Sequence, residues 1–313
     1  MEYVNENELS QFLKDLLDDA GAAISGKVYL RLNDNSVLEN SMFDVALQTV
    51  VQDNGDYVLY VTPESLDDEY AISHELLHIC ARKMIPSFVR VIEPNVIGMI
   101  GTELQGYLEH NWILAEQKRR GLEIDELQLF SDLKTKVSAE EQGLEKNINR
   151  ILTINHLLRT FPAVFDNYKA YLEENCPRSM AISQRIMARF PDKETYSNYE
   201  ARKAVVGAIK EWTKVFREYG FNSVNLSLLL SVTPVFSSKQ LQRMTNVILG
   251  LTPKAILNNK NQTASNIIYT LSDGQCCMVF SIDEEGVKSI QNFMNIKTLE
   301  EFLSIAKIPY LLR

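Results

Sequence analysis

Proline and glycine residues divide the second half of the chain into a series of segments with helical periodicity. Apolar residues recur at helical spacing within these segments, and the breaks between them fall at residues that end helices readily. The chain contains 13 glycines and 9 prolines among 313 residues, which is low for a turn-rich all-β protein. The sequence therefore predicts helices over 138–160, 163–175, 179–190, 196–219, 225–231 and 238–249.

The two ends of the chain mix helical and strand patterns. Apolar spacing and alternation predict helices over 7–20 and 41–52 and strands over 27–32 and 57–61. Near the C-terminus, two apolar runs flank Ser272-Asp273-Gly274, a turn sequence that is typical of a β-hairpin. We therefore expect an α+β fold.

The mixture of helices and strands gives way to successive helices between residues 125 and 135. We place a domain boundary there. The prediction is a small N-terminal domain over residues 1–128, followed by a mostly α-helical domain over residues 129–313 that ends in the β-hairpin. The second domain would recognise a substrate or partner, or regulate the first.

Charge and composition exclude several classes of protein. Residues 1–70 hold 15 acidic and three basic residues, whereas the remaining 243 residues carry a net charge of +3. Nucleic-acid binding depends on clustered lysine and arginine, so no nucleic-acid partner is expected. The chain has no run of about 18 apolar residues, no signal-peptide pattern at its start, and four cysteines that form no disulfide framework. We expect a cytoplasmic protein that does not associate with membranes.

One short motif carries recognisable chemistry, namely His74, Glu75 and His78 in the sequence His-Glu-Leu-Leu-His. Residues four apart on a helix lie on one face, so two imidazoles at this spacing can bind one metal ion. The neighbouring Glu75 would take a proton from water at the open coordination position. The spacing therefore predicts a hydrolytic metal site.

The surroundings of the motif favour a buried helix. Ser65 is expected to be the N-cap of a helix that runs to about Met84 and ends before Pro86. Within Ala71–Cys80, no residue outside the motif is charged. Such flanks are typical of a helix beneath a cleft, whereas in the alternative, a chance match whose histidines merely cap or pack, charged neighbours would be common.

Residues 57–120 resemble the zincin metallopeptidases, with Ala71–Cys80 similar to their zinc-binding helix. The metzincin branch extends the motif with a glycine and a third histidine, but Ala81 and Met84 stand at those positions. The resemblance therefore implies the gluzincin branch, in which a glutamate from the following helix is the third zinc ligand. The asparagine-bearing sequence that often surrounds this glutamate in thermolysin-like enzymes is absent.

The next predicted helix offers the third ligand. Glu103, which follows His78 by 25 residues, lies with Tyr107 and His110 along the border of an apolar stripe. Glu103 is the first choice, and His110 is the rival, because histidine is an equally good zinc ligand. If Glu103 binds the metal, His110 and Tyr107 become candidates for stabilising an oxyanion or orienting the substrate. Glu109 is expected to face solvent, and the alternative for Glu103 is an ordinary surface carboxylate.

The sequence thus predicts a zinc-dependent metallopeptidase that cleaves a protein or peptide substrate. Zn²⁺ would be held by His74, His78 and Glu103, and Glu75 would be the general base for metal-activated water. The helical domain is the expected site for a protein partner. Two other classes remain open. One is a non-catalytic regulatory or binding protein that retains a zincin scaffold, and the other is a zinc hydrolase of a non-peptide amide.

Overall fold

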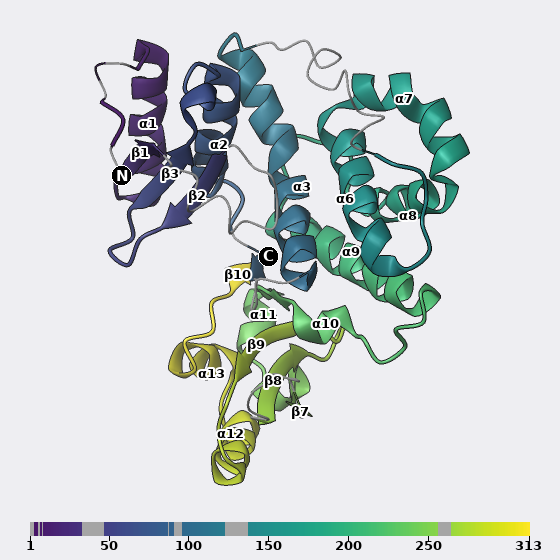
Figure 1. Ribbon diagram of the computed structural model, residues 1–313. Helices are drawn as coiled ribbons and strands as arrows, with labels where there is room; N and C mark the ends of the chain where they lie inside the picture. The colour runs from purple at the N-terminus through teal and green to yellow at the C-terminus, as the bar shows by residue number, and fades with distance from the viewer. Residues whose placement is uncertain are drawn as a thin grey trace. The chain divides into compact units, whose positions relative to one another are not determined.

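A computed structural model describes residues 3–5, 7, 9–32, 47–86, 88–90, 96–122, 137–255 and 264–313 (Figure 1). Helices and small sheets both occur, so the predicted α+β fold class is confirmed. The chain divides into two compact units. The first unit consists of Met1–Pro86 and Glu109–Ser131, and the second consists of Ser87–Leu108 and Asp132–Arg313. The predicted boundary between residues 128 and 129 lies outside the described residues.

The first unit is built on a mixed sheet with the strand order β1-β3-β2. The central strand β3 (Tyr57–Val61) runs parallel to β1 (Val28–Leu32) and antiparallel to β2 (Leu47–Val51). All five residues of β3 are buried, as its continuous apolar sequence predicts. Helices α1 (Gln11–Ile24) and α2 (Glu69–Ala81) pack against each other, and each contacts the sheet.

The prediction of a helix over 41–52 is wrong for residues 47–51. Residues 47–51 form β2 instead, and residues 41–46 lie outside the described residues. The sequence of β2, Leu-Gln-Thr-Val-Val, is rich in β-branched residues, and all of it pairs with β3. Pairing with a buried strand therefore outweighs the helical spacing of the apolar residues.

Helix α2 begins later than the sequence predicts. Its N-cap is Asp68, whose side chain accepts a hydrogen bond from the backbone N–H of Ala71 at 2.9 Å. Ser65, the expected N-cap, instead ends the 3₁₀ helix η3 (Pro63–Ser65), where it forms a capping box with Thr62. Ser65 is therefore part of the capping box of η3, and the acidic residue Asp68 caps α2.

The second unit contains a group of four packed helices, in which α6 contacts α7 and α8, and α8 contacts α9 (Figure 1). All four agree with predicted segments, but α6 begins at Leu144 and not at residue 138. Residues 138 and 139 belong to the preceding loop, where their carbonyls accept hydrogen bonds from the Arg150 side chain. No helix in the described ranges is long and apolar enough to cross a membrane. The bounds are α6 (Leu144–Thr160), α7 (Pro162–Asn175), α8 (Pro177–Met187) and α9 (Asn198–Glu218).

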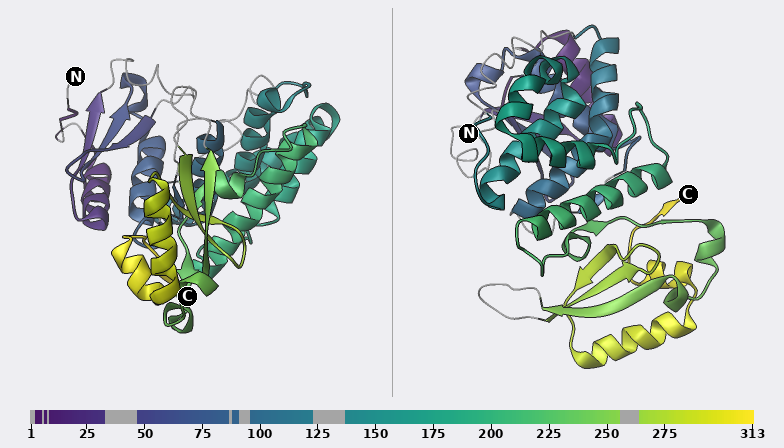
Figure 2. Two further views of the ribbon diagram at one scale, coloured as in Figure 1. Left: turned by 90° about the horizontal axis from the view of Figure 1, so that it is seen from below. Right: turned by 90° about the vertical axis from the view of Figure 1, so that its right-hand side faces the viewer.

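The C-terminal part of the second unit is an antiparallel sheet with the order β7-β8-β9, against which α12 and α13 pack (Figure 2). The predicted hairpin is confirmed, since β8 and β9 flank Ser272-Asp273-Gly274. These elements are β7 (Leu249–Ala255), β8 (Ala264–Thr270), β9 (Cys276–Phe280), α12 (Glu284–Ile296) and α13 (Leu299–Ile305). The smaller elements are β4 (Val89–Arg90), α10 (Leu226–Leu229), β5 (Ser231–Val232), β6 (Val235–Phe236), α11 (Ser238–Leu241), η4 (Thr245–Val247) and β10 (Leu311–Leu312).

The helix expected over 238–249 is much shorter than predicted. It ends at Leu241, and the chain enters β7 at Leu249 after η4. Gly250 lies so close to the Tyr269 ring on β8 that a Cβ atom there would be 2.4 Å from Cζ of Tyr269. The absence of a side chain at Gly250 therefore allows β7 to pair closely with β8, so the hairpin is extended to a three-stranded sheet.

An ion pair ties the β8–β9 turn to the helices of the second unit. Arg202 of α9 donates hydrogen bonds to the carboxylate of Asp273, and the backbone N–H of Gln275 donates to the same carboxylate at 3.1 Å. The side chains of Arg202 and Asp273 are 11% and 19% exposed. Burial opposes ionisation of Asp273, but Arg202 and the other donors outweigh it and lower its pKa below the ordinary value of 3.8.

Asp273→Asn is expected to lower the free energy of unfolding at pH 7 by about 2–3 kcal/mol, because it leaves a largely buried guanidinium without its counter-charge. A depressed folded-state pKa means that the contribution is complete above pH 3.8 and is lost as the pH falls through the folded value. Denaturant unfolding at pH 7 and pH 3 would measure the difference. An equal difference at both pH values would contradict this account.

Candidate metal centre

Helix α2 holds the histidine motif on its least buried face. Ile72, Leu76 and Leu77 are fully buried on the other sides of the helix. His74, Glu75 and His78 are only partly exposed and lie within one arc of the helix surface. The apolar flanks in the sequence thus anchor the helix in the core and leave the polar motif at its surface.

Three of the four histidines in the chain lie together. His74 and His78 of α2 meet His110 of helix α3 (Val96–Arg119), and one ring nitrogen from each lies within 4.8 Å of the others. The ring centroids are 5.0 Å, 5.3 Å and 5.1 Å apart, so the three rings surround a common point. These three side chains could hold a metal ion.

The His78 ring is oriented by a buried carboxylate. Its Nδ1 atom lies 2.7 Å from Oε2 of Glu109, which is 6% exposed. Burial acts to lower the pKa of His78, but the hydrogen bond and charge of Glu109 and the charge of Glu75 outweigh it and raise the pKa. The expectation that Glu109 faces solvent is therefore wrong, because a buried carboxylate must be paired and His78 pairs it.

The His74 ring is oriented by a buried amide. Its Nδ1 atom lies 3.3 Å from Oε1 of Gln117, which is 1% exposed. The Gln117 amide nitrogen donates in turn to the Tyr70 carbonyl at 3.0 Å and to the Ser73 hydroxyl at 3.1 Å. The amide is thus fixed with its oxygen toward His74, so Nδ1 of His74 is the donor.

These two contacts make the cluster a suitable metal site. Acceptors at Nδ1 of His74 and of His78 keep a proton on that atom and present Nε2, with its lone pair, as the ligand atom. Metal-binding histidines usually donate the opposite ring N–H to a carboxylate, a backbone carbonyl or water, and the Gln117 amide oxygen is an acceptor of the carbonyl kind. The donor set and its surroundings therefore fit an ion that prefers imidazole nitrogen.

Glu75 lies beside the cluster in an environment that favours its neutral form. Burial raises the pKa of the Glu75 carboxyl above its ordinary range, and the charge of Glu109 adds to the rise, although His78 acts against it. A carboxyl of this kind is suited to accept a proton and return it near neutral pH.

The structure does not bring Glu103 and Tyr107 into the cluster. Both belong to the second unit, and the ligand atoms grouped among the described residues are those of the three histidines. Tyr107 is fully buried with its ring against Phe190 at a centroid distance of 5.6 Å. Burial raises its pKa well above the ordinary value, and the charge of nearby Glu103 adds to this. These positions favour packing roles within the second unit.

Sequence reasoning missed Glu109 and Gln117. Gln117 follows His110 by seven residues and therefore lies on nearly the same face of α3. That spacing could have identified it as a partner for the histidines. Glu109 offered no comparable signal, because its burial results from the packing of α3 against α2.

Comparison with models of known protein families shows no match to this chain. No curated protein and no solved structure matches it either. The function of the cluster must therefore be inferred from its own residues.

Glu109→Gln is expected to weaken Zn²⁺ binding by about 10- to 100-fold, because glutamine keeps the size of the side chain but removes the charge that holds the proton on Nδ1 of His78. Competition with a chromophoric chelator would measure the affinity. Glu116→Gln is the matched control, since Glu116 lies on the same helix but pairs with Arg119 and Arg120. Equal losses in the two variants would contradict a specific role for Glu109.

Proposed function

We propose that this chain is a zinc-dependent metallopeptidase whose metal is held by His74, His78 and His110. The observation that carries the proposal is the convergence of three imidazoles from two helices, with acceptors on Nδ1 of two of them. Three imidazole ligands and an open fourth position are typical of catalytic zinc. The adjacent Glu75 favours hydrolysis over a purely structural site, because a structural site has no use for a proton acceptor.

The proposed donor set differs from that of the gluzincins in one ligand, since a histidine replaces the glutamate. A zincin-like first unit is thus part of the proposal, supported by the His-Glu-Leu-Leu-His motif on α2 and by its mixed sheet. Three neutral ligands leave the charge of the ion less compensated than two histidines and a carboxylate would. That difference favours one further candidate, a zinc hydrolase of a non-peptide amide.

Each residue of the cluster has a distinct role in the proposed reaction. Bound zinc would supply Lewis acidity, which polarises a carbonyl group and acidifies water. Glu75 would accept the proton of the attacking water and deliver it to the leaving amine. Glu109 and Gln117 act through the histidines, whose rings they hold in one orientation.

The substrate is proposed to be a peptide segment of neutral or basic character, because residues 1–70 carry a net charge of −12. A protein partner or substrate would be recognised by the helices of the second unit. We place the protein in the cytoplasm, without nucleic-acid or membrane partners.

Metal analysis and cleavage mapping test the proposal. The purified chain is expected to contain one zinc per molecule, and a proteome incubated with it should yield new peptide termini that EDTA abolishes. Zinc without new termini, but with release of amine from small amides, would favour the non-peptide hydrolase. A chain without stoichiometric zinc would overturn the enzyme and favour a regulatory protein.

A further inference from the structure

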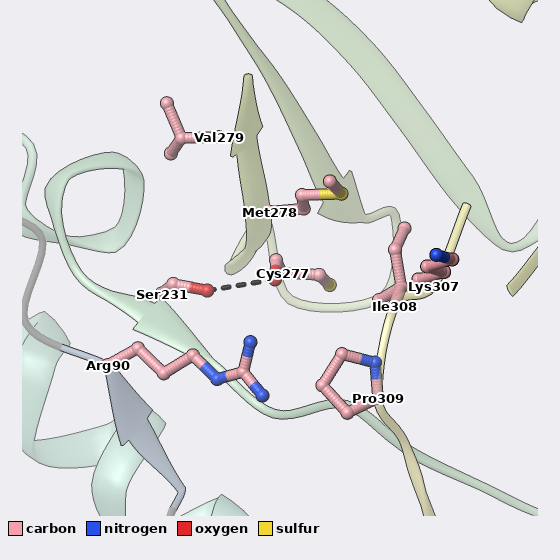
Figure 3. A pocket seen from close by; sticks show the side chains of 8 residues that line it. All are labelled: Arg90, Ser231, Cys277, Met278, Val279, Lys307, Ile308 and Pro309. Carbon is pink, nitrogen blue, oxygen red and sulfur yellow. Dashed lines mark hydrogen bonds between the residues drawn. The ribbon is translucent and has the colours of Figure 1, made fainter. Parts of the chain in front are cut away.

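A pocket lies within the second unit and shares no residue with the histidine cluster (Figure 3). Its volume is about 250 Å³. Strands β4 and β5 pair along one side, where Arg90 is opposite Ser231. Strand β9 and the segment that follows α13 complete the lining, with Cys277 on the former and Ile308 on the latter.

Two cationic side chains line this pocket without an acidic one. Arg90 extends from β4 toward Pro309, and Lys307 lies beside Ile308 (Figure 3). Neither Arg90 nor Lys307 forms an ion pair with a carboxylate in the part of the chain that the structure describes. The acidic residue nearest to Cys277 in sequence, Asp273, is paired with Arg202. Two positive charges at one cavity therefore lack a counter-charge from these residues.

The position of Lys307 is unusual for a lysine. It follows the last turn of α13 with a φ of 52°, where the N–H of Ile308 donates to the carbonyl of Leu303 at 3.0 Å. Glycine or asparagine is common at this point of a helix end, because a Cβ atom is disfavoured there. The lysine thus occupies a backbone conformation beside the pocket that is disfavoured for a residue with a Cβ atom.

The buried part of the pocket lining is largely apolar, whereas Arg90, Lys307 and Pro309 are exposed. Ser231, Cys277 and Ile308 are 6%, 5% and 4% exposed. The Ser231 hydroxyl donates to the Cys277 carbonyl at 2.8 Å, which leaves its oxygen able to accept a further hydrogen bond (Figure 3). Met278 and Val279 add apolar surface. The volume is below the roughly 300–1,000 Å³ of pockets for drug-sized ligands.

We propose that this pocket binds a small organic anion with one carboxylate or phosphate group and a compact apolar body. The planar guanidinium of Arg90 matches the paired oxygens of either group, and Lys307 adds a second charge. The apolar body would cover Met278, Ile308 and Pro309. This site is independent of the proposed hydrolytic function, and its natural ligand would act on the second unit as an effector.

Calorimetric titration of the full chain with phenyl phosphate and with benzoate tests the proposal, in the presence and absence of EDTA so that binding to a metal is separated from binding to the pocket. We expect one site per chain in both conditions and at least tenfold weaker binding of neutral benzamide. Tighter binding of phenyl phosphate would indicate a phosphate effector, and tighter binding of benzoate would indicate a carboxylate effector. Inorganic phosphate alone should bind at least tenfold more weakly than phenyl phosphate.

Arg90→Gln should weaken the tighter ligand at least tenfold, and Lys307→Asn should weaken it while retaining the left-handed backbone. Lys239→Gln removes one charge from an exposed lysine outside the pocket and should leave binding unchanged. Thermal unfolding of each variant would establish that it is folded. Absence of binding, equal affinity for benzamide or for inorganic phosphate, or equal losses in Arg90→Gln and Lys239→Gln would each overturn the proposal.

Discussion

His110→Ala is expected to remove stoichiometric zinc from the purified protein, whereas Glu103→Ala is expected to leave the zinc content unchanged. In the proposed centre His110 binds the ion directly, so the fall in affinity should exceed the roughly 10- to 100-fold effect of losing an outer hydrogen-bond partner. Glu103 lies in the second unit beside Tyr107, and its carboxylate is not among the clustered ligand atoms of the described residues.

Mass-spectrometric metal analysis and chelator competition would measure zinc content and affinity in the two variants. His156→Ala is the matched control, because His156 lies on α6 and is not part of the histidine cluster. Circular dichroism would establish that each variant is folded. Retention of zinc by His110→Ala together with its loss from Glu103→Ala would make Glu103 the third ligand and refute the proposed centre.

Glu75→Gln is expected to lower peptide cleavage by about 10²- to 10⁴-fold while the protein keeps its zinc, because the amide is nearly the same size as the carboxyl but cannot accept the proton. Glu75 is not one of the three proposed ligands, so the ion should be held as tightly as in the wild type. The effect should appear in the rate of turnover rather than in metal content or folding.

Cleavage mapping with wild type and Glu75→Gln side by side would show the loss of new peptide termini. Glu69→Gln provides a control on the same helix, since Glu69 lies in its first turn and outside the cluster. Identical cleavage patterns for wild type and Glu75→Gln would show that the activity does not arise at this site. Identical behaviour of the two proteins in every assay would favour a regulatory protein.

Helical spacing alone predicted that His74 and His78 face one direction, and the structure brings them together. Helical spacing could not predict which residue of α3 lies beside His74 and His78. Glu103 and His110 are seven residues apart, so they share a face but differ by about 10 Å along the axis. The choice between them depends on how α3 packs against α2, which periodicity does not encode.

The same distinction between local and long-range signals applies to the fold. Helices α7, α8 and α9 lie close to their predicted ranges because prolines and caps mark their ends locally. Strand β2 exists because β3 pairs with it, and β7 exists because β8 pairs with it. The sequence predicts β2 as helix and predicts neither helix nor strand for β7 beyond Leu249, since a pairing partner outside the segment leaves no mark on its own periodicity.

Helix α3 is one continuous helix of 24 residues that serves both units. Its earlier half places Tyr107 in the second unit, and its later half supplies Glu109, His110 and Gln117 to the histidine cluster. The first segment of the first unit therefore cannot form the site alone, because a fragment that ends at residue 86 would lack Glu109, His110 and Gln117. Because this helix belongs to both units, we expect zinc at the proposed site in the first unit to raise the melting temperature of both units together.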